Sequence, residues 1–295
     1  MGEAIAGLPC SLVFGHSLRE WLLEDIGRGD VTTDALLQSI ALSEQPYEAI
    51  WQVKAPGVIA GLPIAAEVFR LIDPQLQATV EATDGEWCEC GRIVLRLKGS
   101  LRALLTGERT ALNLAMRLSG IATMTRRYVE AIADLPTRLV DTRKTTPGLR
   151  VLEKYASRLG GAINHRLGLD DAVMLKDNHI AAAGGIGSAI ALVRAHSPFP
   201  LTIEVETETL DMVAEAIKHR AAIIMLDNMP LEMMRTAVAM IRDASDQIQI
   251  EASGNVTLET IRAIAETGVD YISSSAPITR SPWLDLSMRL MSQPD

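Results

Sequence analysis

From residue 137 onward, the sequence alternates short apolar runs with segments of helical periodicity. Six runs of strand length follow one another, each separated from the next by a helical pattern. Parallel strands need such long crossovers, whereas antiparallel strands can be joined by tight turns. The unbroken alternation therefore favours a parallel α/β barrel. The strands are predicted at residues 139–140, 172–175, 201–206, 221–226, 248–252 and 271–272.

An open doubly wound sheet is the alternative arrangement of the same elements. Its usual signature, G-x-G-x-x-G after the first strand, is not found there, and the glycines at 184, 185 and 187 resemble it only weakly.

The segment from Val140 to Ile180 is interpreted as a strand–helix–strand unit. Its helix is expected to open at Pro147 and to stop at Gly160-Gly161.

The residues before 137 follow a different pattern. A short amphipathic helix is predicted at 17–26, with Ser17 as a possible N-cap. Strand-like runs with short connections follow between 49 and 97, with a helix at 63–72, which indicates a small antiparallel α+β module. Residues 100–133 have helical periodicity, and Gly107 and Gly120 are expected to divide them into two or three helices.

These patterns predict three parts of the chain. An N-terminal α+β domain covers 1–115, and a parallel α/β barrel covers 116–280. Residues 281–295 are predicted to form a C-terminal tail that packs back on the N-terminal domain.

Composition excludes some classes of function. The chain of 295 residues is 48% hydrophobic and 22% charged, which is typical of a soluble globular protein. Its net charge of -9 argues against nucleic acid or an anionic membrane as the main partner. No apolar run approaches the roughly 18 residues of a membrane span. The three cysteines do not complete a zinc site, and we expect reduced thiols and a cytoplasmic location.

Basic residues lie next to the first two predicted strands of the barrel. Arg143 and Lys144 follow the first strand, and Lys176 follows the second. His165 and Arg166 precede the second strand and could reach the same place. Because ligands of parallel α/β folds bind at the carboxyl ends of strands, these residues predict a site for a multiply anionic ligand. Ordinary solvated loop charges are the alternative.

Acidic residues close the next two strands. Glu206 and Asp227 form a pair that suits Mg²⁺ with substrate phosphates, or that stabilises a developing cation at a sugar carbon. Solvated strand-end carboxylates are the alternative. Glu204 and Glu251 lie inside strands, and Glu204 points the same way as Glu206 at another depth. Glu206, nearer the carboxyl end, is the better candidate.

Small-residue turns follow the last two strands. Ser253-Gly254-Asn255 and Ser273-Ser274-Ser275 can present backbone N–H groups to a phosphate, although an ordinary strand–helix connection is an equal alternative.

Arg109 is a further candidate for binding a ligand. It falls on the first turn of a helix predicted to start at Gly107, where the helix dipole does not favour a cation. It could serve a ligand or a surface salt bridge to Glu108.

Several strings of the sequence, in order and over nearly the whole chain, resemble the quinolinate phosphoribosyltransferase family, also called carboxylating nicotinate-nucleotide pyrophosphorylases. These are EDIGRGDVTT from Glu24, GERTALN from Gly107, DTRKTTPGLR from Asp141, NHRLGL from Asn164, KDNHI from Lys176, IEVE from Ile203, MLDN from Met225 and EASGN from Glu251. The resemblance implies conversion of quinolinate and phosphoribosyl pyrophosphate into nicotinate mononucleotide, pyrophosphate and CO₂, with Mg²⁺, in NAD biosynthesis. It also implies an open-sandwich N-terminal domain followed by an incomplete parallel α/β barrel of six to seven strands. The family works as a homo-oligomer, so a dimer or a hexamer is implied as well.

The resemblance assigns roles to the candidate residues. Arg109 would reach the site of a neighbouring subunit, and the other cations would surround the quinolinate carboxylates and the pyrophosphate. Glu206 and Asp227 would serve Mg²⁺ and the ribose, and Ser253, Gly254 and the backbone near Ser275 would hold the 5′-phosphate. Lys144, Lys176, Glu206 and Asp227 would be catalytic. Many members have glycine where this chain has Ser275, and a third glycine in the loop at 160–163.

Two other functions would use part of the same residues. A related enzyme could use another acid such as nicotinate, but a monocarboxylate should need fewer cations than this chain carries. A non-catalytic paralogue could bind a metabolite or join a transport complex, but it would be expected to lose Glu206, Asp227 or Lys176, and all three are present.

Overall fold

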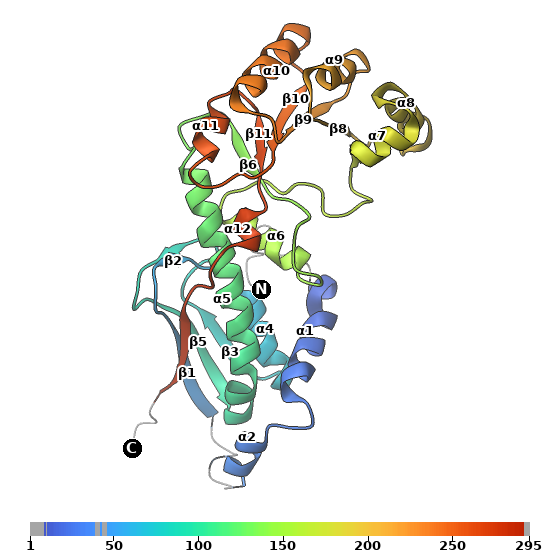
Figure 1. Cartoon of the computed structure of the whole chain (residues 1–295). Helices are drawn as coiled ribbons and strands as arrows, with labels where there is room; N and C mark the ends of the chain where they lie inside the picture. Colours follow the sequence, from blue (N-terminus) through green and yellow to red (C-terminus); the bar gives the residue numbers. More distant parts are fainter. Residues whose placement is uncertain (1–8, 10, 39–41, 43–45, 292–295) are drawn as a thin grey trace. The chain divides into compact units, whose positions relative to one another are not determined.

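The computed structural model describes residues 9, 11–38, 42 and 46–291 (Figure 1). These residues form two compact units. The first takes in the described residues of Met1–Arg126, Thr146–Gly160 and Arg280–Asp295, and the second is Arg127–Thr145 with Gly161–Thr279. The chain therefore leaves the first unit and returns to it twice.

The first unit is built on an antiparallel sheet. Its strands are β1 (Pro46–Val53), β5 (Ile93–Ser100), β3 (Gln77–Val80) and β12 (Leu286–Leu290), in the order β12-β1-β5-β3. Ala49, Trp51 and Val53 alternate along β1 and are buried, as expected of a sheet with one face in a core. β12 pairs with β1, so the C-terminal end of the described chain joins the sheet built by the N-terminal part. A two-stranded sheet joins β2 (Gly57–Val58) and β4 (Trp87–Cys88).

Helices complete this unit. They are α1 (Ser11–Ile26), α2 (Val31–Leu36), α4 (Leu62–Ile72), α6 (Arg150–Leu159) and most of α5 (Leu101–Glu130). α4 buries Ile64, Val68 and Phe69 along one face, which is the spacing of an amphipathic helix. α1 starts six residues before the predicted helix, so Ser17 lies inside it and is not an N-cap.

The prediction of two or three helices at 100–133 was wrong, because α5 is a single helix of 30 residues. Its glycines allow close packing rather than ending the helix. A Cβ atom at Gly107 would lie 2.8 Å from the Phe69 ring, and one at Gly120 would overlap the Pro282 carbonyl oxygen. Tertiary packing thus outweighs the cost of roughly 1 kcal/mol for each glycine in a helix. The predicted division at residue 115 falls inside this helix, whereas the two units divide after Arg126.

The second unit contains the predicted parallel strands. They are β6 (Arg138–Val140), β7 (Val173–Leu175), β8 (Ile203–Thr207), β9 (Ile223–Asp227), β10 (Gln249–Ser253) and β11 (Tyr271–Ser273). The order β6-β11-β10-β9-β8-β7 is parallel throughout, and β6 and β7 are its two ends, which confirms an incomplete barrel. Its helices are α7 (Asp177–Ala183), α8 (Ile186–His196), α9 (Leu210–Lys218), α10 (Leu231–Ala244), α11 (Ile261–Ala265) and α12 (Ala276–Thr279) (Figure 1).

The predicted strand–helix–strand unit at 140–180 was wrong in its packing. β6 and β7 are parallel but lie at opposite ends of the sheet, and the connecting helix α6 belongs to the first unit. α6 also begins at Arg150 and not at Pro147, since Pro147 to Leu149 form a turn in which Gly148 has a φ of 82°. A helix that packs on another unit cannot bring its two flanking strands together.

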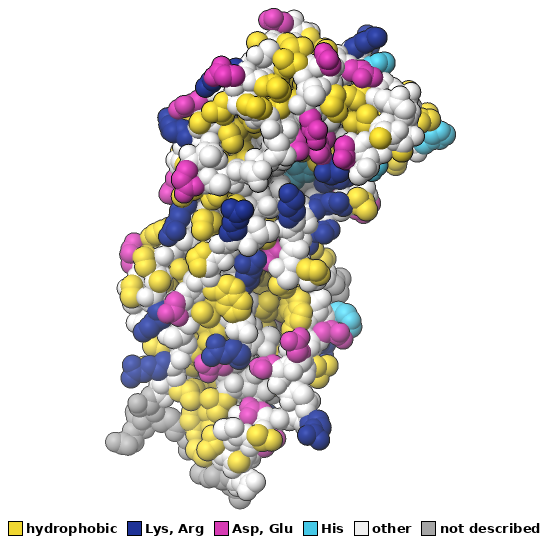
Figure 2. All heavy atoms as spheres, in the orientation of Figure 1, with side chains coloured by type: hydrophobic (Ala, Val, Ile, Leu, Met, Phe, Trp, Pro, Cys, Tyr) yellow, Lys and Arg dark blue, Asp and Glu magenta, His cyan; other side chains and the backbone are white. Residues whose placement is uncertain are grey.

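Hydrophobic, acidic and basic side chains are interspersed over the face drawn in Figure 2. Among the described residues, none of the helices combines the length and the apolar character that crossing a bilayer requires.

Candidate active site

A pocket of about 420 Å³ opens at the carboxyl ends of the strands of the second unit. Strands of a parallel sheet end on the same edge, so residues far apart in sequence meet there. The pocket is lined by nine of the predicted site residues, which are Arg143, Lys144, His165, Arg166, Lys176, Glu206, Asp227, Ser253 and Gly254. Residues not predicted as ligands also line it, among them Asp141, Met174, Met225, Asn228, Glu251 and Ser273.

The loop after β6 supplies the first cations. Lys144 is exposed, and its N–H donates to Thr142 Oγ1 at 3.0 Å, which shapes the turn. Arg166 is half-buried and donates from Nη1 to the Ala172 carbonyl oxygen at 2.8 Å. Burial lowers the pKa of Arg166, and the neighbouring Arg143 cation lowers it further. Two guanidinium groups thus face a shared space that favours an anion.

Lys176 and Glu206 connect the basic and acidic sides of the pocket. Lys176 stands at the N-cap of α7, where its N–H donates to His179 Nδ1 at 3.0 Å. Its Nζ lies 2.8 Å from Glu206 Oε2, at the end of the neighbouring strand β8. The lysine side chain is 45% exposed and the glutamate 14%, so the pair is open to a ligand.

The turns that follow β9 and β10 are joined by a backbone hydrogen bond. Asn228 has a φ of 52°, a left-handed conformation that asparagine adopts more readily than most residues. Its N–H donates to the Ser253 carbonyl oxygen at 2.9 Å, and its Nδ2 donates to Asp227 Oδ2 at 2.8 Å. Gly254 has a φ of 104°, and a Cβ atom there would overlap the Asn228 side chain. This turn therefore requires glycine at 254 and orients Asp227.

The last strand presents a different serine from the predicted one. β11 ends at Ser273, which lines the pocket and whose buried Oγ has no hydrogen-bond partner among the described residues. Ser275 is not among the lining residues. Its carbonyl oxygen accepts hydrogen bonds from the N–H groups of Ile278 and Thr279 and so opens α12. An unpartnered buried hydroxyl is costly without a ligand, which makes Ser273 a candidate that the sequence pattern did not single out.

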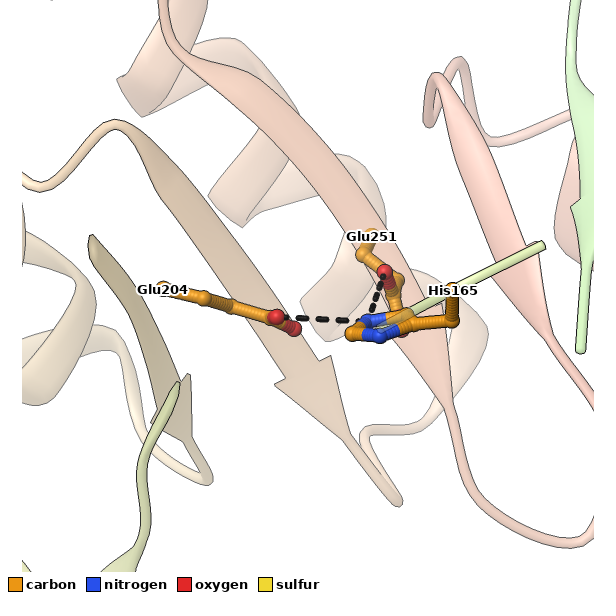
Figure 3. A group of neighbouring side chains, drawn as sticks. All are labelled: His165, Glu204 and Glu251. Carbon is orange, nitrogen blue, oxygen red and sulfur yellow. Dashed lines mark ion pairs between the residues drawn. The ribbon is translucent and has the colours of Figure 1, made fainter. Parts of the chain in front are cut away.

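His165 lies between two buried glutamates, as Figure 3 shows. Its Nε2 is 3.2 Å from Glu204 Oε2 and 3.4 Å from Glu251 Oε2. Burial lowers the pKa of His165, but the hydrogen bonds and charges of Glu204 and Glu251 raise it to about 10. These three residues are close enough to hold a metal ion. A charged residue inside an otherwise apolar strand was the sequence signal for both glutamates, and strand depth was the reason for preferring Glu206.

Arg109 lies in the first unit and does not line this pocket. It is exposed on α5, which begins at Leu101. The expectation that Arg109 occupies a first helical turn was therefore wrong, because the helix starts eight residues earlier. Thr106, the residue before the predicted helix start, lies inside α5 and donates its hydroxyl to Asp30 Oδ2 at 2.9 Å.

Comparisons with known proteins agree with this geometry. The family model for the C-terminal domain of quinolinate phosphoribosyl transferase matches residues 121–289, and the model for its N-terminal domain matches residues 30–119. The chain is 61% identical over 284 residues to the probable carboxylating nicotinate-nucleotide pyrophosphorylase of Synechocystis sp., covering 96% of this chain and 95% of that protein. It is 45% identical over 271 residues to the Bacillus subtilis protein of that description, covering 92% and 91%.

A solved structure shows the same fold. The nicotinate-nucleotide pyrophosphorylase of Francisella tularensis superposes with a TM-score of 0.90 at 36% identity, covering 98% of this chain and all of that chain. Two family models together span most of the sequence, and the relatives match it nearly from end to end. The chain therefore belongs to the quinolinate phosphoribosyltransferase family.

Proposed function

We propose that this protein transfers the phosphoribosyl group of phosphoribosyl pyrophosphate to quinolinate with decarboxylation. The products are nicotinate mononucleotide, pyrophosphate and CO₂, a step of NAD biosynthesis. The observation that carries the proposal is a single pocket in which Arg143, Lys144, His165, Arg166 and Lys176 gather beside a carboxylate pair. Quinolinate carries two carboxylates, and its partner carries phosphates, so both substrates need this density of cations.

The cations position the acid for attack. Arginine forks bind carboxylates in two-point contacts, which can orient the pyridine nitrogen toward the ribose carbon. Arg143 and Arg166 supply such forks, and Lys144 and Lys176 add point charges for the pyrophosphate. As the pyrophosphate leaves, the developing positive charge at the sugar carbon faces Glu206 and Asp227. Once the ring nitrogen is bonded to the sugar, its positive charge stabilises the electron pair left on the adjacent ring carbon as CO₂ departs. A proton from water then completes the C–H bond at that carbon.

Glu206 and Asp227 are also the residues that would hold Mg²⁺. Both line the pocket at the ends of the adjacent strands β8 and β9, and both present oxygen ligands. Mg²⁺ usually binds one or two carboxylates together with water and substrate phosphates, so this donor set fits it. The ion, when bound, neutralises charge on the leaving pyrophosphate.

The turns after β10 and β11 are proposed to bind the 5′-phosphate. Ser253 and Gly254 line the pocket, and the left-handed backbone at Gly254 lets the turn approach a ligand closely. The Ser273 hydroxyl, which has no partner among the described residues, supports this assignment. The backbone near Ser275 is proposed to contribute to the same phosphate site.

The protein is proposed to work as a homo-oligomer, a dimer or a hexamer. In this arrangement Arg109 completes the site of a neighbouring subunit. The exposure of Arg109, and its position in the unit that does not contain the pocket lining, support this role. We further propose a cytoplasmic location. Free thiols at Cys88 and Cys90 support a reducing compartment.

One assay tests the reaction. Purified protein is incubated with quinolinate, phosphoribosyl pyrophosphate and Mg²⁺, while nicotinate mononucleotide and CO₂ are followed together. Parallel reactions replace quinolinate with nicotinate or omit the metal. Product and CO₂ in equal amounts from quinolinate are expected. Product from nicotinate alone would assign a related enzyme, and no product from folded protein would overturn the proposal.

A further inference from the structure

We infer that Glu204 and Glu251 are positioning residues, which hold the His165 ring so that the loop 164–166 presents Arg166 to the pocket. This inference rests on the proposed function, because Arg166 is assigned there to a substrate carboxylate. Both glutamates are inferred to act through His165, and Glu204 lies outside the pocket lining.

The two glutamates converge on one atom. Glu204 projects from β8 and Glu251 from β10, on either side of β9, and each is only 3% exposed. Both Oε2 atoms point at His165 Nε2 (Figure 3). The Oε1 atoms are buried and have no hydrogen-bond partner among the described residues. The histidine ring is therefore the principal polar contact on which both buried carboxylates depend.

The other ring nitrogen faces the backbone. Nδ1 of His165 lies 2.8 Å from the backbone N of Arg166. Nε2 faces both carboxylates, so its N–H donates to them. The ring therefore joins the two buried glutamates to the backbone of the loop 164–166.

These contacts connect the cluster to the pocket. The ring fixes the backbone N–H of Arg166, and Nη1 of the same arginine donates to the Ala172 carbonyl oxygen. On the other side, Asp141 is 2% exposed and accepts from the His165 N–H at 2.8 Å and from Asn164 Nδ2 at 2.6 Å. Three buried carboxylates therefore hold a loop of three residues. A two-point guanidinium contact is weakened when the guanidinium is misplaced by about 1 Å, so an arginine held in one position binds its carboxylate better.

Two substitutions at Glu251 separate reach from charge. Glu251→Gln keeps an acceptor oxygen at the same distance but removes the charge, and Glu251→Asp keeps the charge but withdraws the oxygen by one methylene. Positioning predicts that Glu251→Asp raises the KM for quinolinate about tenfold or more, with the KM for phosphoribosyl pyrophosphate changed less than about threefold. The separate variant Glu251→Gln should keep the KM for quinolinate within about threefold of the parent value.

Each outcome decides the inference. The opposite order, with Glu251→Asp normal and Glu251→Gln impaired, would assign an electrostatic role and overturn positioning. Equal rises for both substrates, or no rise in either variant, would also overturn it, as would stoichiometric metal lost from Glu251→Gln protein. Thermal unfolding identifies a variant that does not fold, and Glu204→Gln with Glu204→Asp then gives the same comparison on β8. Failure of the parent enzyme to use quinolinate would instead count against the proposed function.

Discussion

Lys176 Nζ and Glu206 Oε2 lie 2.8 Å apart at the pocket mouth, so one lysine spans the ends of β7 and β8. The same carboxylate is a proposed Mg²⁺ ligand. Lys176 therefore binds an oxygen for which the metal would compete. This shared oxygen makes the two residues informative targets.

Substitution of Lys176 by methionine should lower kcat by about 100-fold or more, because it removes a cation aimed at the departing pyrophosphate. The methionine side chain matches the aliphatic stem of lysine in length, so packing of that stem is preserved. The measurement is the initial rate of nicotinate mononucleotide formation at saturating substrates. Lys218→Met, an exposed lysine near the end of α9, is the matched control and should leave the rate unchanged. Equal rates for both variants would contradict the role of Lys176.

The proposed metal ligands predict a change in Mg²⁺ dependence. Glu206→Gln and Asp227→Asn should each raise the Mg²⁺ concentration for half-maximal rate by about tenfold or more, because an amide is a weaker ligand than a carboxylate. Chelation with EDTA should stop the parent enzyme, and added Mg²⁺ should restore it. Glu208→Gln, at an exposed residue just beyond β8, should leave the metal titration unchanged. A parent enzyme that is active in EDTA would remove the metal from the proposal.

Shared sites predict that two inactive variants restore one another. Arg109→Ala and Lys176→Ala are each expected to be inactive, but equal mixtures should regain about a quarter of the parent activity if random dimers form. Half of such dimers would be mixed, and each would contain one complete site. Rates are measured after subunit exchange, with each variant mixed with itself as the control. A mixture that stays inactive despite proven exchange would mean that Arg109 serves its own chain.

Gly254→Ala should disrupt phosphate binding. Its φ of 104° disfavours any side chain, and the new Cβ atom would overlap Asn228. We expect a loss of about 1–3 kcal/mol in unfolding free energy, and a KM for phosphoribosyl pyrophosphate raised about tenfold or more. Gly268→Ala is the control, since its φ is 93° but its Cβ atom would lie 3.5 Å from Val238 and outside the pocket lining. That control should lose stability and keep its KM. A Gly254→Ala enzyme with normal KM would remove the turn from the phosphate site.

Tyr155→Phe tests the core of the first unit. The Tyr155 hydroxyl donates to Asp84 Oδ2 at 2.8 Å, where Asp84 also accepts from the N–H groups of Gly61 and Leu62. Removing the donor should lower the unfolding free energy by about 1–3 kcal/mol. Chemical denaturation measures the loss, and Tyr47→Phe on β1 is the control.

The loss in Tyr155→Phe should depend on pH. Burial raises the pKa of Asp84, and the tyrosine hydrogen bond opposes that rise. Without the bond the folded-state pKa rises further, so stability falls as pH increases from the unfolded pKa of about 4 toward the folded value. The difference between variant and parent should therefore be larger at pH 7 than near pH 4. If the difference in unfolding free energy between variant and parent is the same at both pH values, the Tyr155 hydrogen bond does not affect the pKa of Asp84.

The alternation of short apolar runs and helical segments was enough to predict the six parallel strands and the residues at their ends. That success has a physical reason. Strand and helix periods are local properties, and parallel strands necessarily end on one edge, so Arg143, Lys176, Glu206 and Asp227 had to meet. The family motifs then assigned chemistry that spacing alone left open.

Other features depended on contacts between residues distant in sequence. Gly107 and Gly120 look like helix breakers by local propensity, but they lie inside α5 because Phe69 and Pro282 pack against them. The sequence alone does not distinguish Ser273 from Ser275. Only the position at which β11 ends decides that Ser273 lines the pocket. Glu204 and Glu251 were set aside for their depth, yet their burial around His165 is what joins them. Periodicity determined which residues reach the site, and tertiary packing decided which of them act there directly and which act through a neighbour.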